Sequence, residues 1–457
     1  MSKPSIPQGT RDFSAATLYK RTFILDTIRA VFRLYGFEPL ETPAMENLDT
    51  LMGKYGEEGD KLIFKILNNG LNDPKNTDKA KLGFDKLMEG KNTAELTERA
   101  LKYDLTIPFA RYVAMNHGQL TFPYKRYQVQ PVWRADRPQK GRYREFTQCD
   151  ADIVGSKSLI NEVELCNIYH MAFSKMGLKD YSLKINSRKI LAALAELCGG
   201  SDKLTDITIA IDKLDKIGID KVKEELNLKG LDTTQITTVE NYLTIAGGNE
   251  EKLAAIQKLF AGNETAQKGM EEISFVLAQT KNTNISLDLT LARGLNYYTG
   301  IIFEAKASDA VKMGSIGGGG RYDDLTGLFG VPGIPGVGIS FGVDRIYDVL
   351  EELNLFPPDL RAGSQALFFN MGANESLHAL KHMQMLREKD IACEIFHEPA
   401  KLDKQFKYAE KKFIPYVVII GTKEIEHGEA VVKNLKTSVQ QNIPLIRLAE
   451  FFTKINQ

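Results

Sequence analysis

Residues 124–155, YKRYQVQPVWRADRPQKGRYREFTQCDADIVG, decide the fold of this chain. The opening segment, YKRYQVQPVWRA, alternates in places between polar and apolar residues and is rich in residues that favour β-strands. The middle segment, DRPQKGRY, has the proline and glycine of a loop, and REFTQCDADIVG then returns as a second strand. The stretch therefore predicts two antiparallel strands joined by one long polar turn.

Cations crowd into residues 124–144 of this hairpin, where the one acid is Asp136. The cations are Lys125, Arg126, Arg134, Arg137, Lys140, Arg142 and Arg144. Arginine outnumbers lysine, and a guanidinium group binds phosphate oxygens in a planar fork. Phe146 follows directly, and an aromatic ring can stack on a purine. A basic hairpin can also be a solvated surface, but these two features favour a site for a nucleoside triphosphate.

Helices and further strands are predicted on both sides of the hairpin. The spacing of apolar residues predicts helices over 17–35 and 159–177, and a mostly helical insertion over about 200–280. Residues 284–305 have the pattern of strands with a turn, and residues 331–353 that of a loop and a strand leading into a helix. These elements together indicate an α+β protein.

Three other segments are predicted to be irregular in structure or to mark a boundary between domains. Residues 68–91, rich in Asn, Lys, Asp and Gly, indicate an exposed excursion, and residues 313–325, MGSIGGGGRYDDL, a glycine-dense loop. The proline pair at 357–358 predicts a linker. Beyond it, strands alternate with helices, as in a small α/β domain.

Composition narrows the class of protein. The 457 residues carry 59 Lys and Arg against 59 Asp and Glu, and this balance excludes a histone-like basic protein. Hydrophobic residues make up 43% and charged residues 26%, as in globular proteins. No apolar run approaches the roughly 20 residues that cross a bilayer, and the N-terminal residues form no signal segment. The missing apolar run predicts no membrane partner, and the four cysteines lack CxxC spacing, which favours reduced thiols in a cytoplasmic protein.

Several common catalytic motifs are absent from the sequence. It contains no GxxxxGK[ST] phosphate loop, no Rossmann glycine motif with a downstream acid, and no GxSxG nucleophile elbow. His378 and His382 have helical spacing, but Ala379 stands where the zinc motif HExxH requires Glu. No metal ligands are therefore assigned among the protein side chains.

Ordered blocks of sequence resemble a known family. Residues 35–51 (YGFEPLETPAMENLDTL), 132–155 and 336–350 (GVGISFGVDRIYDVL) resemble motifs 1, 2 and 3 of class II aminoacyl-tRNA synthetases. LARGLNYYTGIIFE and GGGGRYDDL are similar to the RGLDYY and GGRYD blocks of the histidyl-tRNA synthetases. LKYDLTIPFARYVAMN resembles the LRYDLT segment of the eukaryote-like branch of that family. The resemblance is weakest over about 70–95 and 200–280.

The resemblance implies a pocket for histidine. Asp104, Thr106 and Gln148 match residues that receive the α-amino group, and these side chains offer the acceptors that an ammonium requires. Asp152 and Tyr298 match the residues that hydrogen-bond the imidazole, whose two nitrogens differ in character. Without the motif context, the favoured interpretation would be that Asp104 caps a helix and that either tyrosine is simply part of the core.

The resemblance also implies residues for chemistry and for ATP. Arg293 matches a residue beside the substrate carboxylate and the α-phosphate, and with Arg134 it is expected to be catalytic. Tyr297 and Tyr322 match tyrosines that line the pocket. The residues implied in ATP binding are Arg134 at the α-phosphate, Arg142 at the phosphates, Arg345 and Phe146 on either side of adenine, and Asp136 near adenine.

The sequence departs from the family pattern at a few positions. Lys102 stands where LRYDLT begins with arginine, and Asn296 replaces the acid of RGLDYY. Asp136 stands where many members have Glu, which weakens its expected contact with adenine.

By resemblance, the chain attaches L-histidine to tRNA(His) through a histidyl-adenylate, using ATP with Mg²⁺. The implied fold is an antiparallel sheet flanked by helices. Its catalytic core spans 1–200 and 281–357, a helical insertion spans 201–280, and an anticodon-binding α/β domain spans 365–457. A homodimer is implied, because motif 1 forms the interface in this class. Two alternatives remain: the synthetase-like regulatory subunit of ATP phosphoribosyltransferase, and a sister synthetase for proline, threonine or glycine.

Overall fold

The computed structural model describes residues 3–292, 297–358, 360 and 363–455. The chain forms two compact units, Met1–Phe356 and Pro357–Gln457, and each has its own hydrophobic core. The boundary falls at the proline pair that the sequence marks as a linker. Each unit is described by itself below.

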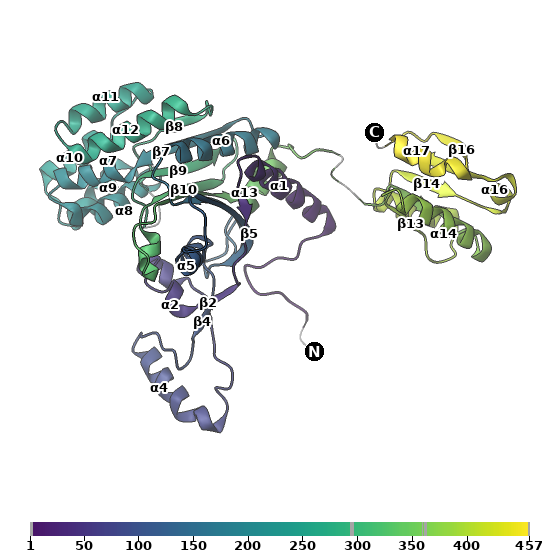
Figure 1. The fold of residues 1–457 in the computed structure, drawn as a ribbon, viewed down its shortest axis with the longest axis horizontal. Coiled ribbons are helices and arrows are strands. Elements are labelled where there is room, and N and C mark those ends of the chain that lie inside the picture. The colour runs from purple at the N-terminus through teal and green to yellow at the C-terminus, as the bar shows by residue number, and fades with distance from the viewer. Residues whose placement is uncertain (1–2, 293–296, 359, 361–362, 456–457) are drawn as a thin grey trace. The chain divides into compact units, whose positions relative to one another are not determined.

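An eight-stranded sheet is the centre of the first unit (Figure 1). Neighbouring strands are antiparallel except at the two edges, where β1 pairs with β5 and β7 with β8 in parallel. In sheet order the strands are β1 (Glu38–Pro39), β5 (Tyr124–Trp133), β6 (Glu145–Val154), β11 (Gly336–Gly342), β10 (Gly317–Tyr322), β9 (Ile301–Ala307), β7 (Tyr181–Ser187) and β8 (Ile285–Leu287). This mixed α+β architecture, rich in antiparallel strands, confirms the expected fold class.

The β5–β6 hairpin forms as predicted, with its polar turn at residues 134–144. Successive side chains of a strand point to opposite faces. Cys149, Ala151 and Ile153 therefore enter the main hydrophobic core. Gln148 and Asp152 point away from that core, and we call the side of the sheet that they occupy the site face.

Helices cover the core side of the sheet. The expected helices over 17–35 and 159–177 are α1 (Ala15–Leu34) and α6 (Ile160–Lys175), and α13 (Val343–Glu352) follows β11. Ile24, Ile28 and Phe32 of α1 recur at helical spacing and are fully buried in the core. The Ser14 hydroxyl caps the start of α1 by accepting a hydrogen bond from the Thr17 N–H.

The prediction of a glycine-dense loop over residues 313–325 is wrong, because Gly317–Tyr322 forms strand β10 in the middle of the sheet. A Cβ on Gly319 would overlap the carbonyl oxygen of Gly338 on the neighbouring strand. A Cβ on Gly317 would lie 2.7 Å from the Tyr169 ring. The glycines therefore allow close packing within a sheet, which a local reading of the sequence takes for turn chemistry.

The insertion over about 200–280 is helical, as predicted. Gly269 of α12 packs tightly on Ile190 of α7, so the insertion shares the core of the sheet. Its helices and the helix before it are α7 (Arg188–Leu197), η2 (Ser201–Lys203), α8 (Leu204–Asp212), α9 (Leu214–Leu228), α10 (Thr233–Leu243), α11 (Asn249–Leu259) and α12 (Glu264–Gln279). They gather at one end of the sheet in Figure 1.

The excursion over 68–91 contains a helix that the sequence reading did not predict. Helix α4 (Thr77–Met88) stands away from the sheet in Figure 1, and Gly83 is its one buried residue. The neighbouring elements of this region are β2 (Met45–Asn47), α2 (Leu48–Leu51), α3 (Gly56–Lys61), β3 (Lys65–Ile66), η1 (Pro74–Asn76), β4 (Arg99–Leu101), α5 (Thr106–Asn116) and η3 (Leu325–Phe329). β2, β4 and β3 form a small antiparallel sheet.

The second unit is a five-stranded mixed sheet with helices, as the alternating pattern predicts. The strands, in sheet order, are β13 (Cys393–Ile395), β12 (Ala366–Phe368), β14 (Tyr416–Ile419), β15 (Glu429–Asn434) and β16 (Gln440–Pro444). The helices are α14 (Ala373–Arg387), α15 (Leu402–Lys411), α16 (Thr422–His427), η4 (Leu445–Arg447) and α17 (Leu448–Ile455). Among the described residues, no helix of either unit is long and apolar enough to span a bilayer.

Candidate active site

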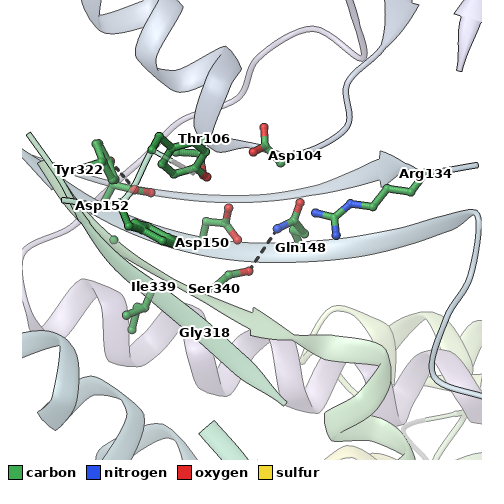
Figure 2. A pocket seen from close by; sticks show the side chains of 14 residues that line it. Asp104, Thr106, Arg134, Gln148, Asp150, Asp152, Gly318, Tyr322, Ile339 and Ser340 are labelled. Atoms are coloured by element: carbon green, nitrogen blue, oxygen red, sulfur yellow. Dashed lines mark hydrogen bonds between the residues drawn. The ribbon is translucent and has the colours of Figure 1, made fainter. Parts of the chain in front are cut away.

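The site face carries rows of residues that the strand register aligns. In one row Arg126 of β5 is paired with Asp152 of β6, and Asp152 with Gly338 of β11. These rows form the floor of a pocket with about 380 Å³ free of protein atoms, part of it open to solvent. The pocket is lined by Asp104, Thr106, Arg134, Gln148, Asp150, Asp152, Tyr297, Tyr298, Gly318, Gly319, Tyr322, Gly338, Ile339 and Ser340 (Figure 2). Every residue that the sequence assigns to histidine is among them, except Arg293, which lies outside the described residues.

Asp104 sits at the start of α5 and uses its two carboxylate oxygens differently. Oδ1 accepts hydrogen bonds from the Ile107 N–H in the first turn of α5 at 3.1 Å and from the Tyr55 hydroxyl at 2.9 Å, so one oxygen of Asp104 has a structural role. Oδ2 is buried and has no hydrogen-bond partner within the described part of the chain. Burial raises the pKa of this carboxyl group. Asp104 therefore combines a structural bond with an acceptor left for a ligand.

Gln148 offers a second acceptor to the pocket. Its Nε2 donates to the Ser340 hydroxyl on β11 at 3.4 Å, which sets the orientation of the amide. Its Oε1 is buried, and no described residue donates to it. Thr106, the first residue of α5, lines the same wall as Asp104. Leaving buried acceptors unpaired costs about 1–3 kcal/mol each, so these atoms are suited to a ligand that brings donors.

Asp152 is held on both sides by neighbours. Its Oδ2 forms an ion pair with Arg126 at 2.8 Å, and its Oδ1 accepts a hydrogen bond from the Tyr322 hydroxyl at 2.5 Å. Arg126 is fully buried, and its guanidinium lies 4.2 Å from the centre of the Phe109 ring. In the sequence, Arg126 is one of seven cations of a basic hairpin, and nothing in that cluster of charge predicts its burial. Its alternation with Gln128 and Gln130 on β5 is the signal that would have placed it on the site face.

Three tyrosine rings form one end of the pocket. The rings of Tyr297 and Tyr298 meet edge to face with centroids 5.0 Å apart, and Tyr297 meets Tyr322 at 6.2 Å. Burial raises the pKa of all three phenols, so they are neutral hydrogen-bonding groups. Gly320 makes room for Tyr298, because a Cβ there would lie 2.8 Å from its ring.

Asp150 is a pocket residue that the sequence reading missed. It is 3% exposed, and its Oδ1 has no hydrogen-bond partner among the residues described. Burial raises the pKa of Asp150 to about 7, with Arg126 opposing the shift and Asp152 adding to it. The alternation Gln148, Asp150, Asp152 in a predicted strand was the available signal, since residues two apart share a face.

The cationic end of the site begins at Arg134. Its Nε donates to the Tyr103 carbonyl at 3.0 Å, and its guanidinium lies 5.1 Å from the centre of the Phe146 ring. Figure 2 shows Arg134 beyond Gln148, at the opposite end of the pocket from Tyr322. The structure thus brings together the arginine and the aromatic ring that the sequence assigned to ATP.

The remaining residues assigned to ATP lie at the tip of the hairpin. Arg142 Nη1 lies 3.8 Å from the Asp136 carboxylate. Arg345 of α13 donates from Nε to the Gly141 carbonyl at 3.0 Å and from Nη1 to the Ser315 carbonyl at 2.7 Å. Arg345 therefore ties the hairpin tip to the segment that precedes β10.

The described residues offer no cage for a metal ion. No group of three His, Cys, Asp or Glu side chains lies close enough together to hold one in the ranges that the structure covers. The four cysteines, Cys149, Cys166, Cys198 and Cys393, are buried free thiols.

Similarity to known proteins extends over nearly the whole chain. The family model described as Histidyl-tRNA synthetase matches residues 86–346, and one described as Anticodon binding domain matches residues 366–455. A histidine–tRNA ligase of Flavobacterium johnsoniae is 51% identical over 97% of this chain and 97% of its own length. A histidine–tRNA ligase of Bacteroides fragilis is 52% identical over 99% of this chain and 100% of its own.

Solved structures share the fold. The crystal structure of histidyl-tRNA synthetase from Nostoc sp. PCC 7120 superposes with a TM-score of 0.82 at 30% identity, covering 100% of both chains. A structure from Bacillus halodurans, titled as an ATP phosphoribosyltransferase regulatory subunit/histidyl-tRNA synthetase, has a TM-score of 0.72 at 19% identity and shows likeness of fold alone. It covers 92% of this chain and 99% of its own. From the ordered motif blocks, the family-model match and near full-length identity of about half, it follows that the chain belongs to the histidyl-tRNA synthetase family.

Proposed function

We propose that the pocket on the site face is where the chain carries out the reaction of its family. The chain is a histidine–tRNA ligase, which attaches histidine to tRNA at the expense of ATP. In the proposed pocket, histidine lies over β6 and β11 between the tyrosines and Arg134, and ATP lies toward the hairpin tip. A histidyl-adenylate forms where the two substrates meet.

The observation that carries this assignment is the pair of buried acceptors, Asp104 Oδ2 and Gln148 Oε1, to which none of the described residues donates a hydrogen bond. An α-ammonium brings three N–H donors, and the Thr106 hydroxyl supplies a third acceptor. The ring of the substrate would then lie at the other end of the pocket, among Asp152 and the tyrosines Tyr297, Tyr298 and Tyr322.

The chemistry needs alignment more than proton transfer. The carboxylate of histidine is ionised at neutral pH, so it attacks the α-phosphorus of ATP without a general base, and pyrophosphate leaves. Arg134 would offset charge on the α-phosphate, with Arg142 at the outer phosphates. Arg293 is assigned beside both reacting groups by its motif alone. In the second step a hydroxyl of the 3′-terminal adenosine of the tRNA attacks the activated carbonyl carbon, and AMP leaves.

Adenine is proposed to lie between Phe146 and Arg345, with Asp136 at its edge. The support is that Phe146 lies beside Arg134 and that Arg345 is anchored to the same hairpin. Mg²⁺ belongs to this proposal as a companion of ATP. Because the described residues form no three-ligand cluster, the ion would be held chiefly by phosphates and water, which suits its usual coordination.

The wider organisation is proposed from the family. Residues 1–200 and 281–357 would form the catalytic core, 201–280 an insertion toward the tRNA acceptor stem, and 365–457 the part that contacts the anticodon of tRNA(His). A homodimer in the cytoplasm would be the working form. Membership of a eukaryote-like branch rests on the segment LKYDLT alone, and the relatives named above, all bacterial, give it no support.

Pyrophosphate exchange with each of the twenty amino acids tests the proposed function. We expect ATP to exchange label with pyrophosphate in the presence of histidine and with no other amino acid. Exchange with proline, threonine or glycine instead would identify a sister synthetase. No exchange at all by a folded protein would favour the regulatory subunit.

A further inference from the structure

The residues that precede α1 lie against the hairpin whose tip is proposed to bind ATP. The carbonyl oxygen of Gly9 accepts a hydrogen bond from the Arg144 N–H at 2.8 Å, at the point where the chain returns from the hairpin tip. A Cβ on Gly9 would lie 2.8 Å from the side chain of Arg144, so the two stretches of chain are in close contact. Residues 7–13, called the N-terminal segment below, are therefore packed on the hairpin.

Arg11 links the N-terminal segment to both the hairpin tip and α13. Its guanidinium lies over the ring of Tyr143, 3.2 Å from the ring centre. Its Nη2 forms an ion pair with Asp344 of α13 at 2.5 Å. Asp344 is 6% exposed, and Arg21 of α1 pairs with the same carboxylate oxygen. One side chain thus bridges an aromatic residue of the hairpin and a buried acid of the helix.

The acidic face of α13 gathers cations from separate parts of the chain. Asp344 and Asp348 are one helical turn apart, and each has a buried Oδ2 with no hydrogen-bond partner among the described residues. Burial raises the pKa of Asp348, and the charge of Arg11 opposes that shift. Lys140, at the hairpin tip, has its Nζ 3.3 Å from the Glu352 carboxylate. The N-terminal segment and the hairpin are therefore drawn to the same face of one helix.

The hairpin tip is thus anchored at more than one point. Arg345 of α13 donates to the Gly141 carbonyl at 3.0 Å, and Arg11 holds Tyr143, two residues further along the chain. Arg142, which is assigned to the phosphates of ATP, lies between these two anchored residues in the sequence. Removing the anchor at Tyr143 would lower the fraction of molecules in which Arg142 is in place for ATP.

We propose that Arg11 is a positioning residue for ATP: by bridging Tyr143 and Asp344, it holds the hairpin tip in the arrangement that binds the triphosphate. This inference rests on the proposed function, because ATP is proposed to bind at that tip. Arg11 acts through the hairpin, since it is not among the residues that line the pocket. A ligand's apparent affinity falls in proportion to the fraction of protein in the binding-competent arrangement, so loss of the bridge weakens ATP binding.

The test measures KM for ATP and KM for histidine in pyrophosphate exchange by the full-length Arg11→Ala variant. We expect KM for ATP to rise by about fivefold to thirtyfold, the range set by losing a cation–π contact between partly buried groups. KM for histidine should stay within about twofold, a small change in free energy, because Arg11 does not contact that pocket. Arg11→Lys should recover part of the loss, since an ammonium keeps the charge beside Asp344 without the planar stack on Tyr143.

Two further comparisons separate positioning from simple loss of charge. Tyr143→Leu removes the ring without changing the charge, and it should raise KM for ATP by a similar factor. The double variant Arg11→Ala/Tyr143→Leu should be no worse than the more affected single variant, because both changes break one contact. Arg29→Ala is the matched control: Arg29 pairs with Asp26 on α1 at 3.2 Å and is 36% exposed, against 27% for Arg11. It should leave both KM values unchanged.

The inference is overturned if KM for ATP in Arg11→Ala stays near that of the unmodified chain, even with a lower melting temperature, because Arg11 would then serve only the fold. It is also overturned if the effects of the two single substitutions multiply in the double variant. If Arg11→Ala does not fold, Arg11→Lys and Tyr143→Leu decide by the same comparison. Histidine-dependent exchange by the unmodified chain shows that the proposed function stands when this inference fails, and absence of that exchange would overturn both.

Discussion

At the scale of the residue, glycines shape the pocket, because a hydrogen atom stands where other residues have Cβ. Gly338 is opposite Asp152 in the register, and the carboxylate of Asp152 occupies the space where a Cβ would stand. The same holds for Gly320 beneath the Tyr298 ring. Glycine in the middle of a strand normally weakens a sheet, so its repeated use here reflects the space that the site needs.

Gly338→Ala should damage the site more than the fold. The new methyl group would displace Asp152 from Tyr322 and Arg126, and overpacking of this kind typically costs about 1–3 kcal/mol. We expect kcat/KM for histidine in pyrophosphate exchange to fall by roughly tenfold to a hundredfold. Gly118→Ala is the matched control, since no atom lies within 4 Å of its added Cβ. Equal activity of the two variants would show that Gly338 has no bearing on the pocket.

Asp150 should make stability depend on pH. Burial raises its pKa from 3.8 to about 7, so between these values the folded chain holds a proton that the unfolded chain releases. Stability from this group is therefore lost as pH rises from about 4 to about 7, by up to about 1.4 kcal/mol per pH unit. Asp150→Asn has no such proton. In urea titrations from about pH 5 to about pH 8, the stability gained by the variant should grow up to about pH 7 and then level off; parallel curves would contradict this.

At the scale of the element, the segment containing α4 joins the rest of the first unit through two stretches of chain that are hydrogen-bonded to each other. These stretches, at Asn68 and at residues 96–98, are called the neck. The Asn68 N–H donates to the Leu96 carbonyl at 2.8 Å, and the Glu98 N–H donates to the Asn68 side chain at 3.0 Å. Outside this neck, α4 is largely exposed, with Phe84 56% and Met88 74% accessible. The two chain ends at the neck are thus close enough to be rejoined without the helix.

Replacing residues 70–92 by a short Gly-Ser linker should leave the first unit intact. Few buried contacts are lost, so the free energy of unfolding should change by less than about 0.5 kcal/mol. Histidine-dependent pyrophosphate exchange should stay within about twofold of the full chain, a difference of less than about 0.5 kcal/mol. Denaturant titration and exchange kinetics would check both. A large loss of exchange in a folded variant would show that α4 contributes to the site.

At the scale of the whole molecule, the two units have separate cores. The second unit buries its own apolar clusters, for example Phe368, Met383 and Val418 in one and Phe369 and Val417 in the other. The pocket residues all belong to the first unit. Domains with their own cores can fold alone.

Removing residues 357–457 should therefore separate two activities. The first unit should keep histidine-dependent pyrophosphate exchange within about threefold, because its pocket is complete without the second unit. Charging of tRNA should fall by at least about tenfold, or about 1.4 kcal/mol, since the part matching an anticodon-binding domain is gone. Both activities would be measured on a truncation whose melting curve is cooperative. Equal loss of both would rule out independent units.

The sequence by itself determined the elements whose signal is local. Alternation and turn residues predicted the β5–β6 hairpin, helical spacing predicted α1, α6 and the insertion, and the ordered motif blocks identified the family. It also named pocket residues such as Asp104 and Gln148, because each lies in a block that resembles a family motif. Each hairpin, helix or motif block is itself a short stretch of chain, so its pattern can be found by reading along the sequence.

Only the tertiary structure decided which distant residues meet. Tyr322 and Asp152 are 170 residues apart in the sequence, yet one donates to the other. The glycines of β10 look like a loop until the neighbouring strands show why a side chain would not fit there. Asp150 looks like any polar strand residue in the sequence, and only the assembled sheet shows that its Oδ1 is buried with no partner among the described residues. Pairing between strands that are far apart in the sequence, and the desolvation that follows from it, are properties of the assembled sheet that a local pattern does not specify.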